Sequence, residues 1–594
     1  MIAYEIVSGV WSGRVRPATG PLPAGWFVTD ISPPAMSVGQ YAAPSPAGWT
    51  VRTTLPVVSI FTPERVISKL TLDGAGGMPD YVGTPQYDGG DGARVRCTDN
   101  TDALNALIQT AVQQQSQVVK IPAGHWGIKK GGLKFESVKR LRIVGDGVGV
   151  TTVDFVLEDA SGDSYVSEQE ACSIAEFVGA ERIEFSDMTI KATTKGGLVT
   201  GSPGSNDVYR GKVWGLKFNN CKEVVFTRVR VERFNYRGVS VYGVATERVK
   251  LTQCEGFFNA GSGFWVSNAA KFIVDGGEFA YNGIPGETGT GYGITASSYV
   301  GEFLCKRVHA HHNYRKGVDS HGCAKFVVKQ SDFNENVLDH VAFVNNYPPG
   351  GTVDVDVSVV GNSFSNGQTE DARAWLSLAY AALVTNGYSL DAAAAGAATS
   401  ISDPSNTIKA VAFERNSLIA HFNGVGVGLI SKSRPIINIV TPLASVEFST
   451  NRLDLQYAAL GGGDAYSRFL IAAVGSVVEM NNNAVYARTA TYDGSDYGVL
   501  FEFKRLSPAL RLEGNNFVIQ DAVFMASTYQ GARSPVLFDG TGSRRLAARN
   551  TWDYATNCYG GSPFTSQYFL GGTEIGASPL IASENAVIVA GEKT

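Results

Sequence analysis

Long apolar runs, clusters of basic residues and closely spaced cysteines are all missing from this sequence of 594 residues. No stretch of about 18 apolar residues occurs, so we expect no membrane insertion. Lysine and arginine never gather in one run and the net charge is −5, which argues against nucleic acid as a partner. The N-terminal segment, MIAYEIVSGVWSGRVRP, has no basic start followed by an apolar run, and we therefore expect no signal peptide.

Cysteine and histidine are both scarce. The seven cysteines are scattered and show no CxxC spacing, so neither a disulfide framework nor a zinc site is predicted, and a reducing place of synthesis fits best. The histidines also number seven, but they are not scattered. Five of them lie between residues 309 and 340, namely His309, His311, His312, His321 and His340. This clustering indicates where to look for chemistry.

What the chain does contain is glycine, at 68 residues, and aromatic residues, at 10%. From about residue 212 a glycine is followed by a short alternating strand, a turn, a second apolar strand and an Asn-rich turn. The marker positions of this repeat are Gly215, Gly238, Gly263, Gly293, Gly317 and His340. They recur every 23 to 30 residues, and the segments alternate rather than following a helical period. The pattern predicts an all-β solenoid whose stacked repeats share one core.

An amphipathic helix is expected upstream of the repeats. Leu104, Leu107, Ile108 and Ala111 form an apolar stripe, with an N-cap at Asn100 or the residue after it. The strand VVKIP follows. We predict that this helix covers the open N-terminal end of the solenoid.

These segments resemble a known family. The run DGGDG…TDNTDALNALIQTA…VVKIPAGHWGI is similar to the start of the pectate-lyase-like right-handed parallel β-helix, which is common in bacteriophage tailspikes and polysaccharide depolymerases. The resemblance covers roughly residues 70–550. It implies a homotrimer on the tail of a phage particle, made in the host cytoplasm, that binds and usually cleaves a bacterial surface polysaccharide, either capsule or lipopolysaccharide O-antigen.

The repeat pattern and the family resemblance together predict the domain organisation. Residues 1–69, rich in Pro, Gly and Ala with a near-repeated PAGW, are predicted to attach the chain to the phage tail or baseplate. Residues 70–130 supply the capping helix and first coil. Residues 131–550 form the β-helix, with an Ala-rich insertion at 366–408 and recurring Asn turns at Asn416, Asn451, Asn483 and Asn516. Residues 551–594 form a C-terminal cap or trimer contact.

The stacked strands predict one outward face that carries polar side chains. The first residue after each marker should point into the core, and the second and fourth should point out. The inward residues are Leu216, Val239, Phe264, Ile294, Val318 and Val341. The outward ones are Lys217 and Asn219, Ser240 and Tyr242, Trp265 and Ser267, Thr295 and Ser297, and Asp319 and His321. Successive coils should place these about 4.8 Å apart along the face.

Asp319 and His321 are the main candidates for catalysis. A carboxylate beside an imidazole selects its tautomer and raises its basicity, which suits a base that removes a proton from a sugar. The segment also resembles the alginate-epimerase type of β-helix, whose catalytic strand carries Asp-Pro-His preceded by a tyrosine. That resemblance implies roles for Asp319 and His321, with Lys316 in place of the tyrosine and Tyr292 as its substitute from the preceding coil. The reaction it implies is proton abstraction at C5 of a uronate, leading to epimerisation or β-elimination.

Five further residues are predicted to bind substrate. Trp265 and Tyr242 offer aromatic faces to a sugar chain, although the indole can equally be a corner or subunit contact. Arg237 and Arg315 can neutralise a uronate carboxylate, and His340 is expected to line the site.

Several alternatives stay open. Hydrolysis would need paired carboxylates, and the candidates are Asp319 with Asp339, or Asp354 with Asp356, which could also suit calcium. A metal could be bound by His309, His311 and His312. The simpler interpretation is that these histidines face solvent, so no metal or other cofactor is predicted. A non-catalytic adhesin remains the third alternative. The preferred function is a tailspike that depolymerises a bacterial surface polysaccharide by elimination, with hydrolysis as the rival.

Overall fold

The computed structural model divides the chain into two compact units, residues Met1–Ser68 and Lys69–Thr594. The structure describes residues 99–114, 118–156, 172–193, 213–284, 290–346, 354–385, 397–421, 436–457, 469–489, 499–503 and 509–520, together with the strands named below that precede and follow this part of the chain. Within these residues, no helix has the length and apolar character needed to span a membrane.

The first unit is built from antiparallel strands. In it, β1 (Ile2–Val7) pairs with β2 (Val10–Pro17) and β3 (Trp26–Thr29), and β4 (Tyr41–Ser45) pairs with β5 (Gly48–Arg52). The side chains of this unit lie outside the described residues. Attachment to a phage particle therefore stays a prediction.

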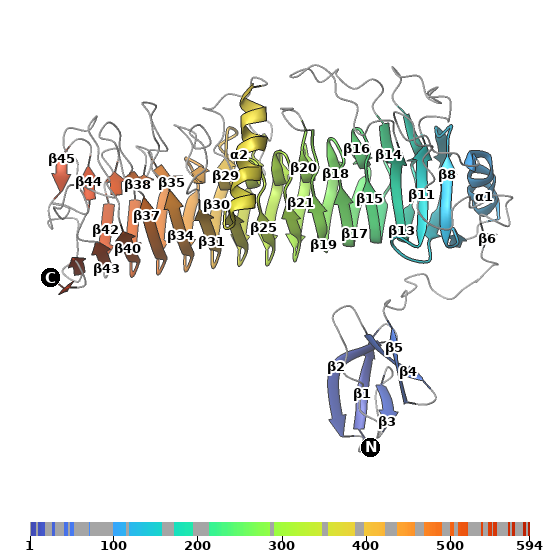
Figure 1. Cartoon of the computed structure of the whole chain (residues 1–594), viewed down its shortest axis with the longest axis horizontal. Helices are drawn as coiled ribbons and strands as arrows, with labels where there is room; N and C mark the ends of the chain where they lie inside the picture. Colours follow the sequence, from blue (N-terminus) through green and yellow to red (C-terminus); the bar gives the residue numbers. More distant parts are fainter. Residues whose placement is uncertain are drawn as a thin grey trace. The chain divides into compact units, whose positions relative to one another are not determined.

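The second unit is a right-handed parallel β-helix made of two long sheets (Figure 1), which confirms the predicted fold class. Sheet 1 has 15 strands. They are β9 (Leu133–Glu136), β12 (Cys172–Val178), β14 (Val213–Asn219), β16 (Arg237–Tyr242), β18 (Ser262–Ser267), β20 (Tyr292–Ser297), β23 (Lys316–Ser320), β26 (Asp339–Val344), β29 (Ala397–Ser402), β32 (Ile437–Val440), β35 (Phe469–Val474), β38 (Val499–Phe503), β41 (Val536–Phe538), β44 (Tyr568–Leu570) and β45 (Thr573–Ile575).

Sheet 2 has 27 strands. They are β6 (Leu70–Thr71), β7 (Val118–Lys120), β8 (Gly124–Ile128), β10 (Arg140–Val144), β11 (Thr151–Val156), β13 (Arg182–Thr193), β15 (Glu223–Glu232), β17 (Thr246–Phe257), β19 (Ala269–Ala280), β21 (Val300–Lys306), β22 (His309–His311), β24 (Cys323–Lys329), β25 (Asp332–Asn334), β27 (Val355–Val360), β28 (Ser363–Asn366), β30 (Ile408–Glu414), β31 (Ser417–His421), β33 (Ser445–Ser449), β34 (Arg452–Tyr457), β36 (Val477–Asn481), β37 (Ala484–Thr489), β39 (Ala509–Glu513), β40 (Asn516–Gln520), β42 (Arg544–Ala548), β43 (Thr551–Tyr554), β46 (Ala586–Val589) and β47 (Glu592–Lys593).

Each coil of the β-helix takes one strand from sheet 1 and two segments from sheet 2. The first half of β19 pairs with β21 and its second half pairs with β22, so sheet 2 runs as two parallel columns. A residue with positive φ marks the bend between the columns, for example Gln253 in β17 and Arg307 between β21 and β22. The repeat predicted from the marker glycines is therefore one coil with three faces.

The marker repeat is in register across the coils. The six predicted inward residues pair directly from strand to strand in sheet 1, and each is at most 3% exposed. The glycine before them is required by close backbone approach. A Cβ at Gly293 would lie 2.6 Å from the carbonyl oxygen of Gly317. The alternation read from the sequence is confirmed here.

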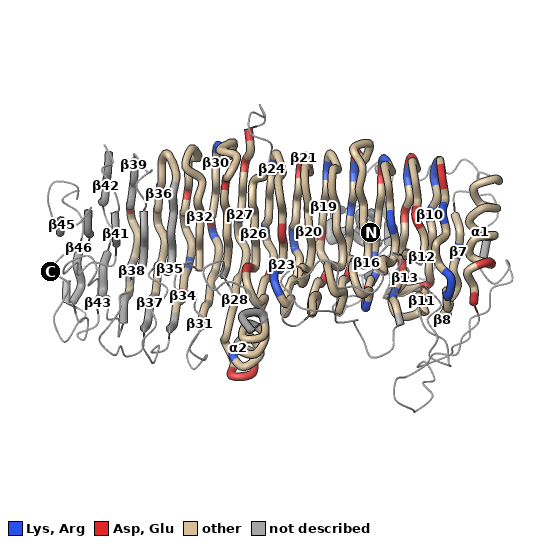
Figure 2. Tube along the Cα trace, turned by 90° about the horizontal axis from the view of Figure 1, so that it is seen from above, with Lys and Arg blue, Asp and Glu red and all other residues tan. Residues whose placement is uncertain are grey.

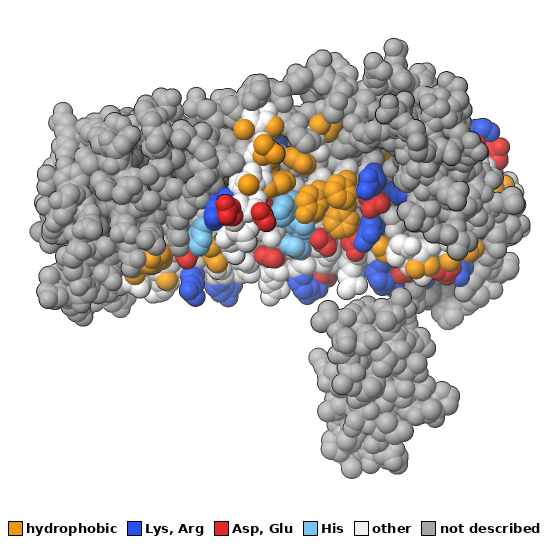
Figure 3. All heavy atoms as spheres, in the orientation of Figure 1, with side chains coloured by type: hydrophobic (Ala, Val, Ile, Leu, Met, Phe, Trp, Pro, Cys, Tyr) orange, Lys and Arg blue, Asp and Glu red, His pale blue; other side chains and the backbone are white. Residues whose placement is uncertain are grey.

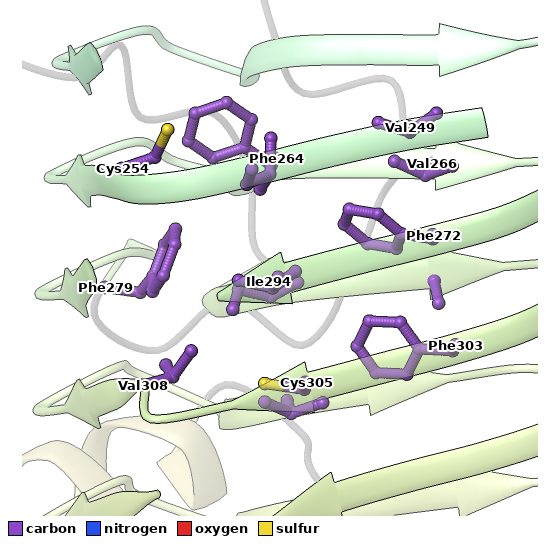
Figure 4. Close-up of a cluster of buried hydrophobic side chains, with 14 of the residues drawn as sticks. Val249, Cys254, Phe264, Val266, Phe272, Phe279, Ile294, Phe303, Cys305 and Val308 are labelled. Carbon is purple, nitrogen blue, oxygen red and sulfur yellow. The ribbon is translucent and has the colours of Figure 1, made fainter. Parts of the chain in front are cut away.

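The core consists of ladders of like residues. Phe272, Phe303, Phe326 and Phe343 follow one another with ring centroids 4.9–5.4 Å apart, and Figure 4 shows part of this stack. Buried asparagines form two further ladders in which each side-chain amide donates to the next. The first ladder is Asn259, Asn282, Asn313 and Asn336, and the second is Asn362, Asn416, Asn451, Asn483 and Asn515. The last member is Asn515 and not Asn516, which instead begins β40.

Oppositely charged side chains form several ion pairs on the N-terminal part of sheet 2, where Figure 2 shows basic and acidic residues close together. Glu184 lies between Arg142 and Arg182, at 3.3 and 3.6 Å, and Glu223 lies between Arg182 and Arg248, at 2.5 and 3.5 Å. These opposite-charge neighbours favour the parallel in-register stacking, although Arg140 and Arg182 are paired directly as like charges.

Two helices pack on the β-helix. In α1 (Thr101–Gln113) the predicted apolar stripe is buried in the common core, and the helix contacts β6, β7 and β9. Its N-terminus is held by Asp99, whose carboxylate accepts from the backbone and hydroxyl of Thr101, while the side chain of Asn100 makes no cap bond. The Ala-rich insertion contains α2 (Glu370–Thr385), in which Leu376 is fully buried.

Glu335 is a buried acid in the corner that precedes β26. Both of its carboxylate oxygens lie within 3.1 Å of the backbone nitrogen of Gly367. Burial raises the pKa of Glu335 from 4.5 to about 7, although the Gly367 N–H and Arg373 act in the other direction. Glu335 therefore binds its proton more tightly in the folded chain than in the unfolded one. Its contribution to stability is present below pH 4.5 and is lost as the pH rises through about 7.

Glu335→Gln is expected to remove this pH dependence, because the amide oxygen can still accept from Gly367 and carries no charge at any pH. Above pH 7 the variant should be more stable than the wild type by about 3 kcal/mol, because each unit of pKa shift corresponds to about 1.4 kcal/mol. Urea unfolding between pH 5 and 8 measures the difference, and Asp356→Asn, at an exposed position of β27, is the control. An identical pH dependence in wild type and Glu335→Gln would contradict the prediction.

Candidate functional site

Three ionisable side chains meet on the outer side of β23. The Nζ of Lys316 lies 2.7 Å from Oδ1 of Asp319, and Nε2 of His321 lies 2.8 Å from Oδ2 of the same carboxylate. Asp319 is only 1% exposed, whereas 38% of the His321 side chain is exposed. The predicted acid and imidazole are thus brought together, with the acid enclosed and the imidazole facing solvent.

The charges in this cluster are well defined. Burial alone would raise the pKa of Asp319, but the ammonium of Lys316 and the hydrogen bond from His321 hold that pKa well below its usual range. Burial alone would lower the pKa of Lys316, but the carboxylates of Asp319 and Asp339 outweigh it and hold the pKa above its ordinary value. At neutral pH, Asp319 is therefore a carboxylate and Lys316 an ammonium. Neither group gains or loses a proton near this pH, so neither can serve as the acid or base of a reaction.

The carboxylate selects the tautomer of His321. An ionised Asp319 can only accept, so the Nε2 of the neutral ring carries the hydrogen and donates it. The lone pair then lies on Nδ1, on the opposite side of the ring. Nδ1 of the half-exposed imidazole is consequently the basic atom of this cluster.

Lys316 was predicted to be catalytic, but its ammonium group is turned toward Asp319 and is largely shielded from solvent. Its side chain is 11% exposed and its ammonium is engaged with Asp319. It therefore positions the carboxylate instead of presenting a group to substrate. The 2.7 Å contact joins the first and fourth residues of β23, and strand alternation by itself does not predict it, because residues three apart on a regular strand point to opposite faces.

Tyr292 lies on the neighbouring strand, directly paired with Lys316. Its hydroxyl accepts a hydrogen bond of 2.5 Å from Arg315, and its ring centroid lies 6.0 Å from the Lys316 ammonium. Strand pairing places Tyr292 beside Lys316, whereas Asp319 is paired with Thr295, so the predicted role of Tyr292 as proton donor stays a prediction. The adjacent guanidinium would stabilise a phenolate at this position.

Trp265 and Arg237 form a second cluster farther along sheet 1. The Arg237 guanidinium lies 3.9 Å from the Trp265 ring centroid and 4.5 Å from that of Tyr236. Strand pairing places Trp265 next to Thr295, and Thr295 next to Asp319. Two coil steps, or roughly 10 Å, therefore separate the indole from the carboxylate.

Three hydroxyls beside this cluster have unused hydrogen-bonding capacity. The side-chain oxygens of Ser240, Ser262 and Thr295 are buried and have no hydrogen-bond partner among the described residues. Ser262 pairs with Arg237, and Ser240 and Thr295 flank Trp265 on either side. Buried hydroxyls without partners are rare in proteins, and a polar ligand is one way to satisfy them. Sequence reasoning named Ser240 and Thr295 as outward residues but missed Ser262.

The hydroxyl group of Tyr242 is bound to another side chain of the protein. Its hydroxyl donates to Glu176 at 2.7 Å, and Glu176 also lies 3.4 Å from Lys217. Burial and the Glu176 carboxylate both raise the pKa of Tyr242. The residue lies on the same face as His321, but its polar group is used in binding Glu176.

His340 was expected to line the site, and this prediction is wrong. The side chain is fully buried, and its two ring nitrogens each lie 2.8 Å from the amides of Asn336 and Asn366. Its ring packs between Phe333 and Phe364. The marker position does not follow simple alternation, because a Cβ at the preceding marker, Gly317, would lie within 3.1 Å of the buried side chains of Asn336 and Phe333. Burial lowers the pKa of His340 to about 3.

The carboxylate pairs proposed for hydrolysis are not supported equally. Strand pairing places Ala342, and not Asp339, beside Asp319. Asp354 is 77% exposed and lies 3.7 Å from Lys409, and Asp356 is exposed on β27 of sheet 2. The second pair therefore lies on a different face from His321.

The comparisons with known proteins bear on the fold. No protein-family model matches the sequence, and no curated protein matches it. Similar solved structures include the catalytic domain of Agl-KA (12% identity, 81% of this chain and 69% of that one, TM-score 0.39), the A-module of the Azotobacter vinelandii mannuronan C-5 epimerase AlgE4 (12%, 87% and 100%, 0.35) and the Dettilon tailspike protein (10%, 80% and 65%, 0.31). Similarities of this size concern the fold alone.

Proposed function

We propose that this chain cleaves a polysaccharide on the outer face of sheet 1, with His321 as the base. The observation that carries the proposal is the Lys316–Asp319–His321 cluster, in which a buried carboxylate orients a half-exposed imidazole. An imidazole held by an enclosed carboxylate is a suitable general base near neutral pH. The Arg237–Trp265 cluster and its unpartnered hydroxyls supply groups that bind a sugar chain two coils away.

The preferred reaction is β-elimination at a uronate. Nδ1 of His321 removes the proton on C5, the electron pair forms the C4–C5 double bond, and the C4–oxygen bond of the glycosidic link breaks. Tyr292 donates a proton to the departing oxygen, and the Arg315 guanidinium stabilises the phenolate that remains. Asp319 stabilises the imidazolium that forms on His321.

The mass of the released oligosaccharides tests this mechanism. Purified capsules and O-antigens are incubated with the full chain and the products are analysed by mass spectrometry. Fragments whose masses sum to that of the parent, each cleavage leaving one unsaturated end, support elimination. Fragments that gain one water per cleavage overturn elimination in favour of hydrolysis. An intact polymer that nevertheless binds the chain would identify an adhesin.

The finer proposal is that the chain is a trimeric tailspike whose substrate is a bacterial surface polysaccharide. Its support is the resemblance of the opening motif and the separate antiparallel unit that precedes the β-helix. Sedimentation of the purified chain tests the trimer, because a monomeric mass would contradict it.

A further inference from the structure

Three side chains suited to a transition metal converge on the outside of sheet 2. His309 and His311 flank Ala310, which is fully buried, so both imidazoles project outward from β22. Their ring centroids are 4.2 Å apart. Glu278 on β19 pairs directly with His309, and its Oε1 lies 2.8 Å from Nε2 of His311.

The geometry is close to that of a coordination sphere. One ligand atom from each of Glu278, His309 and His311 can be chosen so that all three lie within 4.8 Å of one another. Metal bonds of about 2.0–2.1 Å in a tetrahedral site would place such atoms roughly 3.4 Å apart. His309 and Glu278 have side chains 40% and 44% exposed, so they can make this adjustment.

His311 is the anchored member of the group. Its side chain is 10% exposed, and its Nδ1 lies 2.8 Å from Nδ1 of His312, which leaves Nε2 directed toward Glu278. Such a contact through the other ring nitrogen is what orients metal-binding imidazoles. The ring centroid of His312 in turn lies 4.9 Å from that of Trp375 in α2. Figure 3 shows histidine side chains next to hydrophobic ones on the face in view.

The types of ligand atom indicate which metal ions this group of side chains can bind. Two imidazoles and a carboxylate suit Zn²⁺, Co²⁺ or Ni²⁺, whereas Ca²⁺ and Mg²⁺ prefer oxygen ligands. Asp332 on the next coil lies 3.8 Å from Nε2 of His309, within reach of a fourth coordination position. Two carboxylates would balance the charge of a divalent ion.

We propose that Glu278, His309 and His311 bind one divalent transition metal ion of the zinc type, with Asp332 as the fourth ligand. The ion would join three successive coils, β19, β22 and β25, on sheet 2. The reaction proposed above uses sheet 1, so this site does not depend on it. We expect the ion to stabilise the coils and to leave the chemistry at His321 unchanged.

Metal titration of the chelator-treated full chain tests this site. Binding of one Co²⁺ per chain should produce the visible absorption of a four-coordinate site, and Zn²⁺ should displace it. His309→Ala is expected to weaken Zn²⁺ binding by at least about 100-fold, since loss of a direct ligand exceeds the 10- to 100-fold effect of an outer partner. Glu278→Gln, which keeps the side-chain shape, should also weaken it.

The matched control is His421→Ala. His421 lies on β31 of the same sheet, 3.4 Å from Asp454, and belongs to no such cluster among the described side chains. Its substitution should leave Zn²⁺ affinity unchanged. Absence of stoichiometric binding to the wild type, or unchanged affinity in both His309→Ala and Glu278→Gln, would overturn the proposal.

Discussion

Substitution of His321 by alanine is expected to lower the rate of polysaccharide cleavage by at least about 100-fold, the scale on which a positioned general base contributes. The imidazole is 38% exposed and its only described polar contact is with Asp319, so its removal should cost little stability. The measurement is the initial rate of chain cleavage, followed by new chain ends, together with the thermal unfolding profile of the variant.

His421→Ala serves as the control for this experiment as well. His421 also lies near a carboxylate, but on sheet 2, so its variant should retain full activity. Cleavage at the wild-type rate by folded His321→Ala would mean that another residue is the base. The search would then move to Asp339 and the hydrolytic alternative.

Asp319→Ala is expected to damage both stability and activity. The change leaves the ammonium of Lys316, which is 11% exposed, without its nearest carboxylate. Breaking a buried ion pair on one side costs about 3–5 kcal/mol. Because Asp339 remains near this ammonium, we expect the lower end of that range. Chemical unfolding monitored by circular dichroism measures the loss, and cleavage should fall as in His321→Ala.

A double variant separates the two roles of Asp319. Replacing both members of the pair, Lys316→Met with Asp319→Leu, removes the uncompensated charge and should restore most of the stability. Activity should stay lost, because the imidazole no longer has an oriented tautomer. Asp356→Ala, at an exposed position of β27, is the control and should change stability by less than about 0.5 kcal/mol. Recovery of activity in the double variant would contradict a role for Asp319 in orienting His321.

Much of the fold could be predicted because it is a local, repeated pattern. Each coil carries its own alternation, so Val318 and its equivalents could be assigned to the core without any knowledge of their neighbours. The apolar side of α1 could also be predicted from the sequence, since helical periodicity is also a local pattern. The burial of His340 does not follow from this pattern, because alternation assigns the position next to the inward Val341 to the outer side. The structure instead packs its ring between Phe333 and Phe364.

Only part of the candidate site could be predicted from the sequence. Asp319 and His321 are two residues apart, so their shared face follows from strand geometry. Enclosure of Asp319, its pairing with Lys316 and the commitment of Tyr242 to Glu176 do not follow from any short segment. The sequence offered His309 and His311 as possible metal ligands but did not indicate Glu278, because Glu278 comes from a different coil.

The sequence by itself determined the parallel β-helix, the residues that fill its core and the strand that carries an acid next to an imidazole. The tertiary structure alone decided which side chains of different coils touch. Coils are separated by turns and insertions of unequal length, so the number of residues between two contacting positions varies along the chain. Strand pairing removes that ambiguity by bringing each outward side chain about 4.8 Å from its neighbours, and burial then sets their charges.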